Sequence, residues 1–440
     1  MDVNWNVSKE KPHLNLVVIG HVDHGKSTFV GHLLLLKGMI SERSIKEHDA
    51  EAQKYGMRID EVKFAWVLDR LKEERERGMT IDLSFWKFET PKYFFTIIDA
   101  PGHRDFVKNM ITGTSQADAA ILVVSGKKGD YEAGTGPGGQ TREHMFLAYT
   151  LGVRQLVVGI TKMDDPTVKW NQQRYEEVRD GMADLLKITG YKTSEIAFVP
   201  MSGWTGDNIV EPSKNMPWYK GSTIDQALDN LVVPEKPTDK PLRVPIQDAY
   251  TITGVGTVPV GRVETGVMSI GDSVIFMPGG AKGEVRSIET HHVQIQKAMP
   301  GDNIGFSVKG ISKADVHRGE VLGPISNPPT AVKEFIGQVI VIYHPTAIAA
   351  GYTPVLHAHT ATVATTFAEL LQKIDSRTGQ VVEEKPSFLK TGDGALVKFH
   401  PLRPIVLEEY SQIPQVGRFA IRDMGTTVAA GVVRKITEKV

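Results

Sequence analysis

The first half of the chain alternates short apolar runs with segments of helical pattern. Each apolar run ends in Gly, Asp, Ser or Thr and leads towards a helix-favouring stretch. This alternation predicts a mostly parallel sheet with helices on both faces. Ligands of such sheets bind at the carboxyl ends of the strands, where these polar residues lie. The predicted strands are Leu14–Ile19, Tyr93–Ile98, Ala119–Val124, Gln155–Ile160 and Ile196–Pro200.

One long segment interrupts this alternation. Between Ser41 and Arg77 the chain is rich in Glu, Lys and Arg, with Ile, Val, Phe, Trp and Leu recurring at helical spacing. This pattern predicts a charged, helical insertion.

The pattern changes after Val233–Arg243, which contains three prolines at 234, 237 and 241 and predicts a stiff linker. Short alternating strands with glycine-rich turns follow, and they predict an antiparallel β-barrel. A second β-rich block follows Asn327-Pro328-Pro329 and continues to the C-terminus. We therefore predict an α/β domain over residues 1–233 and two β-barrels over 240–326 and 330–440. The strands predicted in the first barrel are Arg243–Ile246, Thr257–Val263, Ser273–Phe276, Gly283–Glu289 and Val293–Gln296.

Composition narrows the class of protein. The 440 residues are too many for one core, and the absence of cysteine excludes disulfides and a cysteine-ligated zinc site. The longest apolar runs, such as Ala119–Val124, are far shorter than the roughly 20 residues that span a bilayer. The N-terminal residues lack the apolar core of a signal peptide. We expect a cytoplasmic protein with no membrane association.

Charge is distributed unevenly along the chain. The formal net charge is −1, with −4 over residues 1–239 and +3 over residues 240–440. A positive C-terminal part permits contact with RNA but does not require it.

The segment after the first predicted strand has the pattern G-x-x-x-x-G-K-[ST] and leads into a helical run to Leu36. Its glycines let backbone N–H groups surround phosphate oxygens, and the helix N-terminus adds its positive end. We expect Lys26 to reach the β- and γ-phosphates, Ser27 to ligate Mg²⁺, and Thr28 to add a phosphate contact. The pattern predicts a nucleoside triphosphate site formed by Gly20, His21, Val22, Asp23, His24, Gly25, Lys26, Ser27 and Thr28.

The strand that ends at Ile98 is followed by Asp99, Ala100, Pro101 and Gly102. A carboxylate at this strand end can hold the metal ion through water. Gly102 lets a backbone N–H approach the γ-phosphate, because it has no Cβ. We predict that these four residues sense the γ-phosphate.

The residues that follow two further predicted strands indicate which base the site binds. An Asp at position 164 can accept two hydrogen bonds from guanine N1–H and N2–H₂, and adenine offers no such donor pair. The stem of Lys162 can cover the base, and backbone N–H groups after the last strand can face guanine O6. GTP and GDP are therefore the predicted ligands, bound by Thr161, Lys162, Met163, Asp164, Ser202, Gly203 and Trp204.

In these motifs the chain resembles the translational GTPases, and among them the elongation factor 1-alpha branch of archaea and eukaryotes. The resemblance covers the whole chain, and the long segment before Arg77 is typical of that branch. The motifs that carry it are GHVDHGKS, RGMTID, DAPGHRDFVKNMITG, TKMD, GVGTVPVGRVETG, HHVQIQKAMPGDNIG, YHPTAIAAGYTPVLHAHTA and GRFAIRDMG.

The resemblance implies a GTPase that carries aminoacyl-tRNA to the ribosomal A site, hydrolyses GTP on codon recognition and is served by a guanine-nucleotide exchange factor. It implies that residues 41–80 form a first switch, in which Thr80 closes onto Mg²⁺ and the γ-phosphate. Asp99–His103 would begin the second switch, and Arg104–Ser115 would form its helix.

The resemblance also implies that His103 is catalytic and orients the attacking water. Neutral imidazole can accept a hydrogen bond from water, and imidazolium can stabilise developing phosphate charge. The alternative is a histidine that only caps the switch helix. His21 and His24 lie inside the phosphate loop, where the backbone matters more than the side chain, so we expect neither to be catalytic.

Two residues depart from the family pattern. Thr161 stands where the guanine motif usually has Asn, whose amide links the base to the phosphate loop. We expect weaker guanine binding with selectivity preserved by Asp164. Met79 replaces the usual Ile of an apolar gate formed with Val22 beside His103, and its flexibility implies looser gating.

The resemblance assigns the two barrels to RNA. The aminoacyl end of tRNA would contact the first barrel around Arg262, Glu264, Arg286 and Glu289–His292, and the second barrel would contact the tRNA stem and partners. The residues themselves predict only exposed polar groups on a β-surface.

Other functions remain open on the same fold. A release factor or a stalled-ribosome rescue factor is a possible cargo, either instead of tRNA or in addition to it. A GTPase of sulfate activation is expected to lack the stretch Tyr343–Thr360, and the gamma subunit of the initiation factor is expected to carry a cysteine-ligated zinc site.

Overall fold

The computed structural model describes residues 11–43, 45, 64, 68, 80, 83–136, 139–290, 293–375 and 380–440. The chain divides into two compact units, Met1–Pro234 and Glu235–Val440. Most of the predicted helical insertion lies outside the described residues. In the described part of the chain, no helix is long and apolar enough to cross a membrane.

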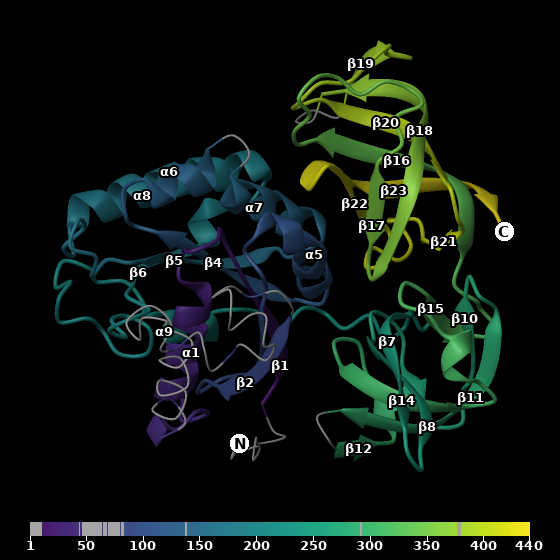
Figure 1. The fold of residues 1–440 in the computed structure, drawn as a ribbon, viewed down its shortest axis with the longest axis horizontal. Coiled ribbons are helices and arrows are strands. Elements are labelled where there is room, and N and C mark those ends of the chain that lie inside the picture. The colour runs from purple at the N-terminus through teal and green to yellow at the C-terminus, as the bar shows by residue number, and fades with distance from the viewer. Residues whose placement is uncertain are drawn as a thin grey trace, which may run out of the picture. The chain divides into compact units, whose positions relative to one another are not determined.

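The described residues of the first unit form a six-stranded sheet in the order β2-β3-β1-β4-β5-β6 (Figure 1). All neighbouring strands are parallel except β2 and β3, so the predicted mostly parallel sheet is confirmed. The five predicted strands are present, and β2 is an addition. The strands are β1 His13–Ile19, β2 Ser84–Glu89, β3 Phe94–Asp99, β4 Ala119–Ser125, β5 Gln155–Thr161 and β6 Ala197–Pro200.

Helices cover both faces of this sheet, as predicted. One face packs against α1 and α9, and the other against α5, α7 and α8 (Figure 1). The predicted helix 104–115 begins with a 3₁₀ turn, Arg104–Phe106, and continues as α5. The helices are α1 Lys26–Leu36, α5 Val107–Ser115, α6 Asp130–Thr135, α7 Gln140–Thr150, α8 Gln172–Thr189 and α9 Ile224–Asp229.

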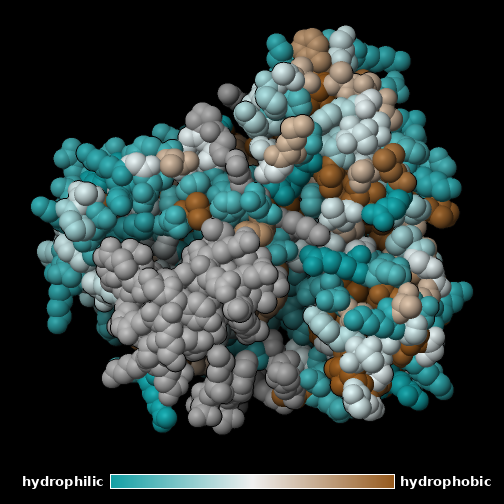
Figure 2. Space-filling model, viewed as in Figure 1, coloured by the Kyte–Doolittle hydropathy of each residue, from teal (hydrophilic) through white to brown (hydrophobic). Residues whose placement is uncertain are grey.

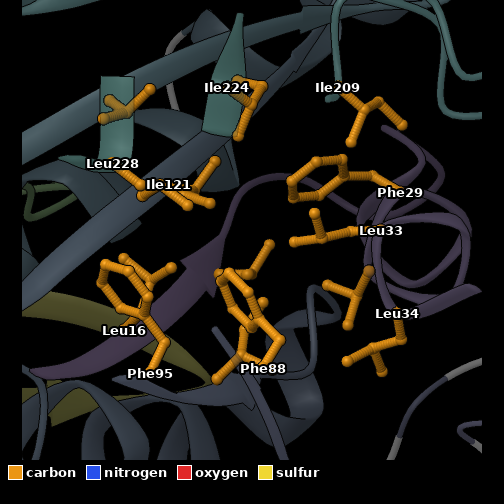
Figure 3. Packing of buried hydrophobic residues seen from close by; sticks show 14 of the residues in the cluster. Leu16, Phe29, Leu33, Leu34, Phe88, Phe95, Ile121, Ile209, Ile224 and Leu228 are labelled. Atoms are coloured by element: carbon orange, nitrogen blue, oxygen red, sulfur yellow. The ribbon is translucent and has the colours of Figure 1, made fainter. Parts of the chain in front are cut away.

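The main core of this unit lies between the sheet and α1 and α9. Because side chains alternate along a strand, Leu16 of β1 enters this core while Val17 faces the other side. Figure 3 shows Phe29 and Leu33 of α1 packing towards Ile224 of α9. The outward face of α6 and α8 is mostly hydrophilic (Figure 2), as expected of helices that pack on a sheet by one side.

In the described residues of the second unit, two antiparallel sheets each close on themselves, and a third sheet has only two strands. In the first, the order is β10-β15-β7-β8-β14-β11-β12, and pairing of β10 with β11 closes the barrel. In the described residues this barrel comprises β7 Val244–Ile252, β8 Gly256–Arg262, β10 Ser273–Met277, β11 Ala281–Thr290, β12 Val293–Ile295, β14 Asn303–Lys309 and β15 Val321–Pro324, with β9 Met268–Ser269 and β13 Lys297–Ala298 pairing separately.

The second sheet runs β17-β22-β23-β16-β20-β18-β19, and pairing of β17 with β18 closes it. An α/β domain followed by two antiparallel β-barrels is therefore confirmed. The strands are β16 Ala331–Val341, β17 Val355–Ala358, β18 Ala361–Ile374, β19 Val381–Glu384, β20 Gly394–Pro401, β21 Ile405–Val406, β22 Arg418–Asp423 and β23 Thr426–Lys439.

A buried ion pair joins the two barrels. Arg243 Nε donates to Glu408 Oε1 at 2.8 Å, and the side chains are only 3% and 7% exposed. Arg243 also donates to the carbonyls of Leu242 and Asn327. Glu408 accepts from the backbone N–H and the hydroxyl of Thr330. The charges are thus paired and hydrogen-bonded, as burial requires.

Glu408→Ala is expected to destabilise the second unit by about 3–5 kcal/mol, because it leaves the charge of Arg243 buried without its counter-charge. The measurement is urea unfolding of the full chain. Glu438→Ala serves as control, because Glu438 pairs with Lys333 at the surface, where a pair contributes about 0–1 kcal/mol. Equal shifts of the two variants would contradict this assignment.

Candidate functional site

The loop between β1 and α1 has a backbone that few side chains would permit. Gly20 has φ +146°, and a Cβ on it would overlap the carbonyl oxygen of Val123 in β4. Gly25, the N-cap of α1, has φ +84°, and Asp23 has φ +58°. No side chain caps α1, so the N–H groups of its first turn are available to an anion.

Lys26 is buried at the start of α1. Its Nζ donates to the carbonyl of His21 at 2.8 Å. Burial lowers the pKa of Lys26 to about 8, although the charges of Asp99 and Asp23 oppose this shift. A cation held in low dielectric interacts strongly with a phosphate.

The turn after β3 lies directly against this loop. A Cβ on Gly102 would overlap Lys26 Nζ and would lie 3.0 Å from the backbone O of Gly20 and the backbone N of Val22. A larger residue here would have to displace Lys26 Nζ and press against the backbone of the loop. Ala100 and Pro101 are buried in the same turn.

Oxygens from three separate parts of the chain meet beside the loop. The Ser27 hydroxyl donates to Asp99 Oδ2 at 2.8 Å and lies 3.0 Å from Thr80 Oγ1. Asp99 is fully buried at the end of β3. Hydroxyl and carboxylate oxygens are ligands that suit Mg²⁺. Thr28 follows in the first turn of α1.

His24 fixes the loop to the strand behind it. Its Nδ1 accepts from the backbone N–H of Ser125 at 3.3 Å, and its Nε2 donates to the carbonyl of Asp130 at 3.0 Å. Burial lowers the pKa of His24 to about 4, so the ring is neutral. Burial and the charge of Lys26 also lower the pKa of His21. These contacts give His24 a structural role in the loop.

Thr161 ends β5 and holds the loop from the other side. Its hydroxyl lies 2.7 Å from the carbonyl oxygen of His24 and 3.2 Å from that of Val124. The residue is only 1% exposed. The threonine thus forms the link to the phosphate loop.

The three residues after Thr161 differ in the contacts that their side chains make within the protein. Lys162 has φ +58°, and its Nζ pairs with Asp130 Oδ2 at 2.8 Å. Asp130 also accepts from Ser125 Oγ. Met163 is buried, whereas the half-buried carboxylate of Asp164 has no hydrogen bond within the described ranges. Asp164 therefore keeps its acceptor capacity for a ligand.

In the loop after β6, the backbone N–H groups predicted to face guanine O6 differ in their contacts. Ser202 Oγ accepts from the backbone N–H groups of Trp204 at 3.2 Å and Thr205 at 3.0 Å. The N–H of Trp204 is therefore used within the loop. Gly203 remains a candidate donor to guanine O6, because its N–H has no partner among the described residues. Its carbonyl accepts from His32 Nδ1 of α1.

His103 is the N-cap of the 3₁₀ turn before α5. Its Nδ1 accepts from the backbone N–H of Asp105 at 3.3 Å and lies 3.5 Å from the Asp105 carboxylate. The side chain is 32% exposed. This is the capping geometry that stood as the alternative to catalysis, and the catalytic role stays a prediction.

Sequence reasoning missed Asp130, which holds both Lys162 and the ring of His24. It lies five residues beyond the end of β4, at the strand edge where the other polar residues gather. Its position near this strand edge was the feature of the sequence that could have identified it. Met79 and His292 lie outside the described residues.

The first barrel corrects one expectation. Arg262 and Glu264 were predicted to be exposed, but their side chains are 8% and 11% exposed and form an ion pair at 3.4 Å. Arg286 and Glu289 on β11 are exposed as expected.

Three features lie at the carboxyl ends of β1, β3 and β5. They are the phosphate loop, the oxygens of Ser27, Thr80 and Asp99, and the carboxylate of Asp164. Together with the barrels they define a P-loop GTPase of the translational class. Family models match as the elongation factor Tu GTP-binding domain over residues 11–242, elongation factor Tu domain 2 over 256–323, and the eEF1A C-terminal domain-like family over 334–434. The chain belongs to the elongation factor 1-alpha family and is a GTP hydrolase.

Known relatives match along nearly the whole chain. Elongation factor 1-alpha of Staphylothermus marinus is 60% identical over 427 residues, 97% of each chain. That of Thermofilum pendens is 61% identical over 429 residues, 97% of this chain and 98% of its own.

Solved structures at lower identity share the fold. The GTPase-like domain of S. cerevisiae Ski7 bound to GTP has a TM-score of 0.77 at 17% identity, covering 96% of this chain and 97% of its own. Elongation factor SelB of Methanococcus maripaludis with a GTP analogue has a TM-score of 0.68 at 21% identity, covering 98% and 80%.

The lowered pKa of Lys26 predicts a pH dependence of nucleotide binding. A bound phosphate favours the charged amine, so binding above pH 8 requires uptake of a proton. The affinity for GDP is expected to fall as pH rises from 8 to 9, by up to about tenfold per unit. Calorimetry in two buffers of different ionisation enthalpy measures both the Kd and the proton uptake.

Lys26→Arg is the matched variant, because a guanidinium stays charged over this range. Its affinity is expected to be independent of pH. A flat profile for the unaltered protein, with no proton uptake at pH 8.5, would contradict the prediction.

Proposed function

We propose that this protein in its GTP state carries aminoacyl-tRNA to the ribosomal A site, hydrolyses GTP on codon recognition, and is returned to the GTP state by a guanine-nucleotide exchange factor. The observation that carries the proposal is the match to elongation factor 1-alpha over 97% of the chain, both barrels included. This role belongs in the cytoplasm.

The phosphates bind at the loop of residues 20–25 and the N-terminus of α1. Lys26 exchanges the carbonyl of His21 for phosphate oxygens, and Thr28 adds a contact. Gly102 provides the backbone N–H nearest to the γ-phosphate, which its packing against Lys26 supports. Asp164 binds guanine N1–H and N2–H₂, and Gly203 donates to O6.

Mg²⁺ fits the oxygens of Ser27, Thr80 and Asp99, with Asp99 acting through water. The hydrogen bonds from Ser27 to the other two residues support the assignment, because they show that the three oxygens converge. When bound, the ion neutralises charge on the β- and γ-phosphates. Thr80 is the residue that connects the first switch to this site.

His103 orients the attacking water. Accepting from the backbone N–H of Asp105 places the proton of a neutral ring on Nε2, where it can only donate. Accepting from water at Nε2 requires the proton on Nδ1. The capping bond must then break, and the carboxylate of Asp105 is near enough to receive Nδ1–H. The ribosome supplies this rearrangement.

The barrels bind RNA and partners. The exposed Arg286 and Glu289 of β11 are the candidates for contact with the aminoacyl end. The second barrel contacts the tRNA stem.

His103→Ala is expected to lower ribosome-stimulated GTP hydrolysis by about 10²–10⁴-fold, the usual contribution of a positioned acid or base. The Kd for GDP should stay within about twofold. Single-turnover hydrolysis measures the first quantity and fluorescence titration the second. His400→Ala, an exposed histidine of β20, is the control. Unchanged hydrolysis in the His103 variant would leave His103 as a helix cap only.

The carrier role is tested by the hydrolysis half-life of an aminoacyl-tRNA ester. The ester should be protected by the protein with a non-hydrolysable GTP analogue and not with GDP. Equal decay in both states would exclude the carrier role and favour escort of a release factor or a rescue factor.

A further inference from the structure

Thr161 has a single hydroxyl hydrogen, and the structure commits it to the phosphate loop. Among the described residues, Thr161 Oγ1 lies within hydrogen-bond distance of the carbonyl oxygens of His24 at 2.7 Å and Val124 at 3.2 Å. Both are acceptors, so the hydrogen points to one of them. With 1% of the residue exposed, the side chain has almost no surface towards a ligand.

A guanine base presents two acceptors, O6 and N7, on one edge. Its N1–H and N2–H₂ edge is met by Asp164 and its O6 by Gly203. Beside O6 lies N7, which accepts but cannot donate. An asparagine at position 161 has two amide hydrogens and could serve both the loop and N7, whereas a threonine has one.

The neighbouring side chains do not replace that donor. Lys162 has polar hydrogens, but its Nζ is held at the carboxylate of Asp130, 2.8 Å away, which directs the ammonium to that group. Met163 is buried and has no polar hydrogen, and Asp164 ionised is an acceptor only. From Thr161 to Asp164, Lys162 is thus the one side chain with polar hydrogens not committed to the phosphate loop, and Asp130 holds it in place.

We propose that this protein recognises guanine without a side-chain hydrogen bond to N7, so that it binds 7-deazaguanine nucleotides as tightly as guanine nucleotides, while Thr161 acts as a positioning residue for the phosphate loop. This inference rests on the guanine site proposed above. The ligand class is a purine nucleotide with the guanine N1, N2 and O6 pattern and any small group at position 7.

The first test compares the Kd of GDP with that of 7-deaza-GDP, in which C–H replaces N7. For the unaltered protein the two values should agree within about twofold. In Thr161→Asn the Kd for GDP should fall by about threefold to tenfold, the usual range for one hydrogen bond, and that for 7-deaza-GDP should not. The Kd of 7-deaza-GDP is therefore expected to exceed that of GDP only in the asparagine variant.

Two matched variants test the positioning role. Thr161→Ser keeps the hydroxyl, so both constants should stay within about threefold. Thr161→Val keeps the shape and loses the hydroxyl, so both nucleotides should weaken together by at least about tenfold, because the carbonyl of His24 loses its donor.

The outcomes separate this inference from the proposed function. If the unaltered protein binds GDP at least tenfold more tightly than 7-deaza-GDP, N7 is recognised and the inference is overturned. If Thr161→Val binds GDP unchanged, the positioning role is overturned. Failure to bind GDP at all, or equal binding of ADP, would instead overturn the guanine site itself.

Discussion

The candidate site depends on the packing of the phosphate loop against the two strands behind it. Gly20 approaches the backbone of β4 too closely for any side chain, and the ring of His24 is bonded on both nitrogens. Thr161 binds the carbonyl of His24 from β5. Because these contacts turn the ring and carbonyl of His24 into the protein, the N–H groups of the loop are left for an anion.

Local chemistry explains what could be predicted from the sequence. A parallel strand that is buried on both faces is apolar along most of its length, so β1, β3, β4, β5 and β6 are visible as short apolar runs. A phosphate loop needs its glycines at fixed spacing because φ is positive there, and Gly25 conforms. Apolar strands and the glycine spacing of the loop depend on residues that are close together in the chain, so they can be recognised in the sequence.

The features that could not be predicted depend on residues far apart in the chain. The hairpin strand Ser84–Glu89 is half-buried and mixes polar with apolar residues, so its pattern is weak. The pairing of Lys162 with Asp130 joins two different strand ends. Arg262 and Glu264 alternate as surface residues would, yet each is buried against the other's charge. Burial of a charge is visible only when its partner is known.

Thr161 shows that holding the loop and selecting the base are separate requirements. N7 is an acceptor in adenine as well as in guanine, so a hydrogen bond to it strengthens both nucleotides and distinguishes neither. In the proposed site selectivity comes from Asp164, whose carboxylate would be left without donors beside adenine. Losing the donor to N7 therefore weakens binding without relaxing specificity. Since affinity differences within one site appear mostly in the dissociation rate, the consequence that the proposed guanine site predicts for a GTPase cycle is faster release of GDP.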